Sequence, residues 1–303
     1  MQEFIDKEEQ LRKQAIEEHL RIRQEEADRR RRMNRCIASC CYVAGAGAFG
    51  TFIRWLQVQT AFTEDGLADR SFFNLLLPLF VLGCIFAFRH LLRQRERERL
   101  VLPESLHGAL QNSKPYFAVA RWVIGLMMCA GALLLFSESA SDKNESIVKI
   151  LAVTAFFSGL SFPLLLSAAN WESRRPPLCR LYATMPVLMF CVWLITCYKT
   201  NAINSEGWSY VVELLAIIAA LLGFFRMAGF AFGVADTEKS MFYAMMGGTM
   251  CIVALADERH TGMQIIFIAS ALMLGMYCAV MTNNLKEKEK KEAPPPQDGF
   301  ERL

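Results

Sequence analysis

Apolar residues along this chain gather in eight blocks that are almost free of acidic side chains. Each block is about twenty residues long, which is the length a helix needs to cross roughly 30 Å of hydrocarbon. Each is expected to be helical, because a segment in hydrocarbon must pair its backbone N–H and C=O groups internally and the two-residue alternation of membrane β-strands is absent. The pattern predicts spans over residues 36–57, 72–92, 116–136, 147–169, 181–198, 210–232, 240–255 and 263–283, the seventh being the shortest.

The two ends of the chain are strongly charged. Residues 1–35 place acidic and basic side chains at the i,i+4 spacing that stabilises a solvated helix. A thin apolar seam in this segment leaves a coiled coil open as the alternative. Residues 284–303 alternate Lys and Glu before three prolines, which predicts a disordered tail. The chain is thus predicted to be an all-α polytopic bundle, residues 36–283, with a helical arm and a tail.

Composition agrees with a lipid environment. Hydrophobic residues make up 53% of the chain and the mean hydropathy is +0.24, which is more apolar material than one soluble core of this length needs. The ten cysteines lie in the predicted spans or at their edges, so no disulfide framework is expected. The net charge of +3 gives no indication of nucleic-acid binding.

The distribution of Lys and Arg predicts the orientation. If the N-terminus is cytoplasmic, the cytoplasmic segments hold 24 of the 33 basic residues and the opposite loops hold only four. Such an asymmetry is the positive-inside pattern of helical membrane proteins. It places both termini in the cytoplasm and favours an even number of spans.

The sequence contains no recognisable catalytic or metal-binding pattern. The H-E-x-x-H motif is absent, and the four histidines fall in cytoplasmic segments, at a span edge or in a loop. Ser161 therefore has no histidine at mid-depth to act as its base. Cys36, Cys40 and Cys41 cluster at the membrane edge but have no second ligand pair at metal-binding spacing. We assign no enzyme activity, metal or cofactor.

Charged residues within spans are functional candidates by default. Five lie close enough to a span end for their side chains to extend to the lipid headgroups: Arg54, Arg89, Arg121, Lys149 and Glu213. Arg226 lies deeper, and it either faces a water-filled cavity or also extends to the headgroups. Thirteen residues, about 20 Å of helix, separate Glu213 from Arg226, so the two cannot pair directly.

The fourth span combines hydroxyl groups with a proline. Ser158 and Ser161 precede Pro163, which frees a backbone carbonyl about one turn earlier and predicts a kink. A kinked, hydroxyl-lined helix suits a substrate cavity, and the alternative is a bend that fits its neighbours. The candidate cavity-lining residues are Arg226, Glu213, Ser158, Ser161 and Pro163.

Four consecutive arginines, Arg29, Arg30, Arg31 and Arg32, end the charged arm just before the first span. Basic residues near a membrane surface are attracted to anionic lipid headgroups. These residues are therefore candidate headgroup contacts, and the alternative is that they serve only to fix topology. Residues 1–35 also offer a surface for a protein partner or a second copy of the chain.

The run from Gly50 to Leu67 resembles a segment of uncharacterised multi-pass membrane proteins of anaerobic Gram-positive bacteria. The resemblance covers only the end of the first span and the loop after it. It implies a bacterial cytoplasmic membrane and brings no known activity.

Two functions are compatible with these features. The first is a transporter or permease component for a small, uncharged or weakly polar solute, with the fourth and sixth spans lining the path. The second is a non-transporting scaffold or regulator whose basic arm and tail bind a cytoplasmic partner or anionic lipid.

Overall fold

A computed structural model of the chain describes residues 2–60, 73–97, 100–101, 105–112, 114–141, 145–170, 176–201 and 210–287. Eight helices in these ranges are long and apolar enough to cross a membrane, as the sequence predicted. They are α1 (Gln2–Thr60), α2 (Phe73–Arg97), α4 (Pro115–Glu138), α5 (Glu145–Asn170), α6 (Pro176–Asn201), α7 (Val211–Phe232), α8 (Thr237–Val253) and α9 (Thr261–Asn283). The protein is a helical multi-pass membrane protein.

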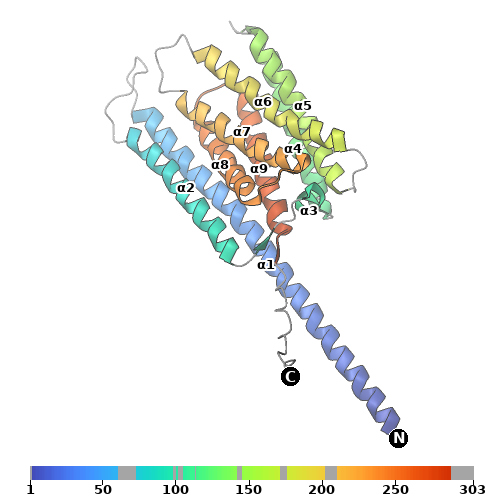
Figure 1. Ribbon diagram of the computed structural model, residues 1–303. Helices are drawn as coiled ribbons and strands as arrows, with labels where there is room; N and C mark the ends of the chain where they lie inside the picture. The colour runs from blue at the N-terminus through green and yellow to red at the C-terminus, as the bar shows by residue number, and fades with distance from the viewer. Residues whose placement is uncertain are drawn as a thin grey trace, which may run out of the picture.

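The charged arm and the first span form one helix. α1 runs for 59 residues without a break, about 90 Å at 1.5 Å per residue. Its N-terminal part projects away from the bundle (Figure 1). We call the end of the bundle from which it projects the arm side, and the opposite end, where α1 ends and α9 begins, the distal side.

α9 is the central helix of the bundle. It packs against α1, α4, α7 and α8 (Figure 1). In its most apolar stretch of 18 residues, 78% is buried inside the bundle, against 22% in the corresponding stretch of α2. A chain of aromatic ring contacts joins it to α5, α6 and α7, through Phe162, Tyr277, Phe224, Phe190, Trp193 and Phe267. Successive ring centroids in this chain lie 4.2 to 6.3 Å apart, a spacing that favours tilted and offset packing.

Small residues let α4 and α5 approach closely. A Cβ atom on Gly159 would lie 2.7 Å from Cys129 Sγ and 2.8 Å from the carbonyl oxygen of Gly125. Only glycine fits there, because one of the obstructing atoms belongs to the backbone. Contacts between small residues are the usual means by which membrane helices pack tightly.

α8 begins three residues earlier than the predicted seventh span, because Asp236 caps it. The Asp236 side chain accepts a hydrogen bond from the Lys239 backbone N–H at 3.1 Å. The side-chain hydrogen bond with Lys239 also lowers the pKa of Asp236. α8 then continues beyond Val253 as a short 3₁₀ turn, η2 (Ala254–Ala256).

The prediction of a disordered tail is wrong for its first four residues. β2 (Lys286–Glu287) pairs in antiparallel register with β1 (Leu100–Val101). The side-chain amide of Asn284 donates to the carbonyl oxygens of Ala109 and Gln111, at the end of the short helix α3 (Leu106–Leu110), both at 2.8 Å. The end of α9 therefore docks on the segment between α2 and α4. The rest of the predicted tail, 288–303, lies outside the described residues.

Candidate functional site

Arg54, near the distal end of α1, is enclosed by protein. Only 2% of its side chain is exposed, so the prediction that it extends to the headgroups is wrong. Its Nε donates to Asp257 Oδ1 at 2.7 Å, and its Nη1 donates to Gln57 Oε1 at 2.8 Å. Arg54 stays inside the protein because the turn between α8 and α9, 203 residues further along the chain, supplies its counter-charge.

Asp257 lies between two arginines. Its second oxygen, Oδ2, accepts from Arg259 Nη2 at 2.7 Å. The other guanidinium nitrogens of Arg259 donate to Glu213 Oε2, from Nε at 3.2 Å, and to the backbone carbonyl of Ala254, from Nη1. The same guanidinium lies 5.4 Å from the centroid of the Phe267 ring. Every nitrogen of this guanidinium therefore has a hydrogen-bond acceptor.

Glu213, at the start of α7, joins this cluster to α6. Its Oε1 accepts a hydrogen bond from the indole N–H of Trp193 at 3.1 Å. Trp193 is fully buried, and a buried indole N–H needs an acceptor. Glu213 was predicted as a cavity-lining residue and as close enough to its span end to reach the headgroups. The structure pairs it within the protein rather than with the headgroups, and 12% of its side chain is exposed.

Two amides extend the cluster to α2. Gln57, one turn beyond Arg54, donates from Nε2 to Asn74 Oδ1 at 2.9 Å. We call the connected set the distal network. It consists of Trp193, Glu213, Arg259, Asp257, Arg54, Gln57 and Asn74. It links α1, α2, α6 and α7 through the turn that precedes α9.

The distal network contains two arginines and two carboxylates, so its formal charges cancel. Taking an ion out of water costs several kcal/mol, and attraction in a low-dielectric interior offsets this cost only with good geometry and further hydrogen bonds. Asp257 and Arg259 meet both conditions, because each ionic group has several partners. Removal of one member would leave its partner charged and unpaired.

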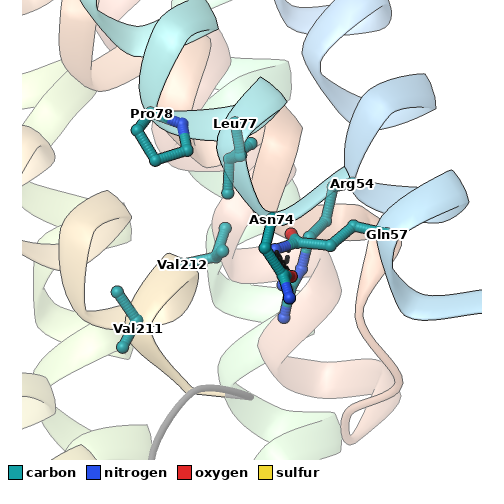
Figure 2. A pocket seen from close by; sticks show the side chains of 7 residues that line it. All are labelled: Arg54, Gln57, Asn74, Leu77, Pro78, Val211 and Val212. Atoms are coloured by element: carbon teal, nitrogen blue, oxygen red, sulfur yellow. Dashed lines mark hydrogen bonds between the residues drawn. The ribbon is translucent and has the colours of Figure 1, made fainter. Parts of the chain in front are cut away.

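A cavity of about 300 Å³ opens beside the distal network. Arg54, Gln57 and Asn74 line one part of it, and the apolar residues Leu77, Pro78, Val211 and Val212 line the rest (Figure 2). The cavity lies between the beginning of α2 and the beginning of α7. Its volume is at the lower end of the range for small-molecule sites, and its mostly apolar wall with a few convergent polar groups is typical of them.

A small amphiphilic molecule would match the chemistry of this lining. The guanidinium and the two amides offer hydrogen bonds at one end, and the aliphatic side chains offer an apolar surface at the other. Because Arg54 already has a carboxylate partner, the cavity offers no uncompensated charge to an ionic ligand.

Ser158, Ser161 and Pro163 are buried where α5 packs against its neighbours. Ser161 Oγ donates to the carbonyl oxygen of Ser158 at 2.9 Å, and Ser158 Oγ is buried with no hydrogen-bond partner among the described residues. A Cβ atom on Gly125 would lie 3.0 Å from Pro163 Cδ. None of the three candidates lines the distal cavity.

Arg226 lies at the other end of α7 from Glu213, on the arm side. It is half-buried, and its guanidinium is 5.9 Å from the Tyr243 ring centroid. Within the part of the chain that the structure describes, its Nε is buried without a hydrogen-bond partner. Its charge also helps to lower the pKa of Asp236, after the larger effect of Lys239. The structure therefore keeps Glu213 and Arg226 apart, as the sequence spacing predicts.

The arginines before the first span lie on the arm. Arg29, Arg30 and Arg31 are exposed, while the side chain of Arg32 lies outside what the structure describes. Within the described ranges, no group of three or more His, Cys, Asp or Glu side chains could hold a metal ion. The ten cysteines all lie in described helices, and none of them forms a disulfide there.

Comparison with known proteins does not place the chain in a family. No protein-family model, curated protein or solved structure matches the chain.

Sequence reasoning missed most of the distal network. Gln57 and Asn74 look like ordinary span-end residues, Trp193 looks like an ordinary aromatic residue within a span, and Arg259 falls between the predicted seventh and eighth spans. One local pattern points to the site: residues 257–260 read Asp-Glu-Arg-His, four ionisable residues in a short turn between two apolar helices. Together with Arg54 and Glu213 near other distal span ends, this turn indicates that charges gather there.

Asp257 is predicted to contribute far more to stability than a comparable exposed carboxylate. Asp257→Asn leaves two buried arginines with one carboxylate, so it should lower the free energy of unfolding by about 3 kcal/mol. Asp236→Asn is the matched control, since asparagine also caps helices and an exposed pair with lysine contributes less than about 1 kcal/mol. Thermal unfolding of both variants in detergent measures the difference. If both variants lose the same small amount of unfolding free energy, Asp257 does not belong to an enclosed network.

Proposed function

We propose that this protein is a transporter, or a permease component, for a small uncharged or weakly polar solute in a bacterial cytoplasmic membrane. The observation that carries the proposal is the distal cavity, where buried hydrogen-bonding groups meet an apolar wall inside a helical bundle. Helical transporters take their solutes between helices in this way.

The charge balance of the distal network supports a neutral solute. Both arginines and both carboxylates have partners within the protein. An ionic solute would have to displace one of these partners or enter without a counter-charge, and either event costs several kcal/mol. A solute with a hydroxyl, amide or carbonyl group needs only hydrogen bonds, which Gln57, Asn74 and Arg54 are positioned to make.

The proposed path runs along α7, which carries Val211 and Val212 in the cavity wall and Arg226 near the arm side. Polar atoms that are buried without partners suit transient contacts with a passing solute, because they already lack hydrogen bonds. Arg226 Nε and Ser158 Oγ are two such atoms. With Ser161 and Pro163, they remain our candidates for the part of the path beyond the distal cavity.

We further propose that the arm side is cytoplasmic, so that the cavity opens toward the outside. The Lys and Arg distribution supports this orientation. The end of α9 docks beside α3 and β1, which follow α2. The chain therefore enters α1 and leaves α9 at the same end of the bundle.

The scaffold function remains the second candidate because of the arm. α1 extends as one helix beyond the bundle, and the side chains described there, such as Arg12, Glu18 and Arg30, are exposed. A rigid charged helix of this kind suits a cytoplasmic partner, a second copy of the chain or anionic headgroups.

Cysteine labelling tests the orientation. On a background without native cysteines, Thr261→Cys at the exposed beginning of α9 should react with an impermeant thiol reagent in intact cells. Ser105→Cys, exposed beside α3, should react only after permeabilisation. Labelling of Ser105→Cys in intact cells would place the arm outside and overturn the proposed topology.

Blocking the distal cavity tests the transport proposal. Leu77, which is 7% exposed, lines the cavity, whereas Leu79, two residues on, is 52% exposed. Leu77→Trp should fill the cavity and reduce flux at least tenfold, and Leu79→Trp should leave flux unchanged. Flux is measured by stopped-flow osmotic swelling of proteoliposomes in glycerol, urea and acetamide.

If wild-type proteoliposomes swell no faster than empty liposomes in all three solutes, or if Leu77→Trp does not change the rate, the transport proposal fails. Pull-down of a cytoplasmic protein through residues 1–35 would then support the scaffold function.

A further inference from the structure

A second concave surface lies on the side of the bundle, nearer the arm. It is a groove of about 510 Å³ whose floor is α9 and whose walls come from α1 and α4, with Ile252 of α8 and Leu255 of η2 also in its lining. Gly275 forms part of the floor, and a Cβ atom built on it would meet no atom within 4 Å. The polar atoms of the lining side chains are the thiol of Cys40 and the hydroxyl of Tyr116.

The size of the groove fits a slender occupant. Its floor runs from Ile268 to Ala279, twelve residues and about 16 Å of helix. This is close to half of the roughly 30 Å hydrocarbon core, the depth that one leaflet's acyl chains occupy. The groove encloses about 510 Å³ over this length.

Positive charge lies at one end of the groove. Tyr116 lines that end, and Lys114 Nζ is 5.7 Å from the Tyr116 ring centroid and donates to Asn283 Oδ1 at 3.4 Å. Lys114 also stands at the beginning of α4, where the helix dipole adds partial positive charge. A phosphate at this position would gain a charge-assisted contact with the ammonium group.

The arm continues the same face of α1. Cys40 lines the groove, and one turn earlier Cys36 Sγ donates to the carbonyl oxygen of Ala279 on the groove floor at 3.6 Å. Arg29 lies two helical turns before Cys36, so it projects from the same face, and it is exposed. Basic groups therefore lie at the arm-side end of the groove and beyond it.

We propose that the groove is a binding site for one anionic phospholipid, with an acyl chain lying along α9 between α1 and α4 and the phosphate beside Lys114. The apolar lining recognises the acyl chain of the lipid, and Lys114 distinguishes an anionic headgroup from a zwitterionic one. The bound lipid then bridges α1 and α4 across the central helix. This site is separate from the distal cavity, which lies at the other end of α1.

Native mass spectrometry of the purified protein tests the proposal, with phosphatidylglycerol or phosphatidylcholine of identical acyl chains added in detergent. Wild-type protein should retain one tightly bound lipid. Phosphatidylglycerol should be favoured about fivefold, the effect of one lysine near an anionic surface. Lys114→Gln should retain a lipid but lose most of the preference. A preference that is absent, or that survives in Lys114→Gln, would overturn the assignment of the headgroup.

Filling the groove tests the acyl-chain site. Gly275→Leu should abolish retention, whereas Gly83→Leu on α2, where a Cβ atom also meets nothing within 4 Å, should retain the lipid. If Gly275→Leu does not fold in detergent, Ala120→Phe narrows the groove from the α4 wall instead. Retention of lipid in a folded, filled variant would overturn the proposal. A wild-type dimer without lipid that dissociates in Gly275→Leu would assign the groove to a second copy.

Discussion

A charge enclosed in a bundle that lipid surrounds needs a counter-charge within the protein, and this constraint organises the distal side. Asp257 meets it for two arginines, since each of its oxygens accepts a hydrogen bond from a different guanidinium. Glu213 then neutralises Arg259 and orients Trp193. Arg54 in turn fixes Gln57, which holds Asn74 at the beginning of α2. One turn of chain therefore sets the relative positions of helices that are far apart in sequence.

Packing holds much of the rest of the bundle together. Large apolar side chains face outward, as Phe86 on α2 does at 72% exposed, while glycines bring α4 and α5 together. α2 is the least buried span, so its distal end depends on the hydrogen bond between Asn74 and Gln57. The distal cavity lies where this peripheral helix stands beside α7.

The spans could be predicted from the sequence, because hydropathy over about twenty residues is a local property that lipid selects directly. The first residues of the tail could not, since the pairing of Lys286–Glu287 with Leu100–Val101 depends on tertiary contact. The prediction for Arg54 failed for the same reason. Its position near a span end favoured contact with the headgroups, but its partner Asp257 lies 203 residues away in the sequence. Glu213 was identified as a candidate because it is a charge in a span, but its partners Arg259 and Trp193 are invisible without the fold.

The central claim is that Arg54 and Asp257 are coupled in the interior. A double-mutant cycle with Arg54→Met, Asp257→Leu and the double variant tests it most directly, with unfolding free energies measured in detergent. The account predicts a coupling free energy of about 2 kcal/mol or more, because each single variant leaves the other ion buried with fewer partners. A coupling below about 0.5 kcal/mol, the size expected for independent sites, would show that Arg54 lies among the headgroups and that the distal network does not hold the bundle together.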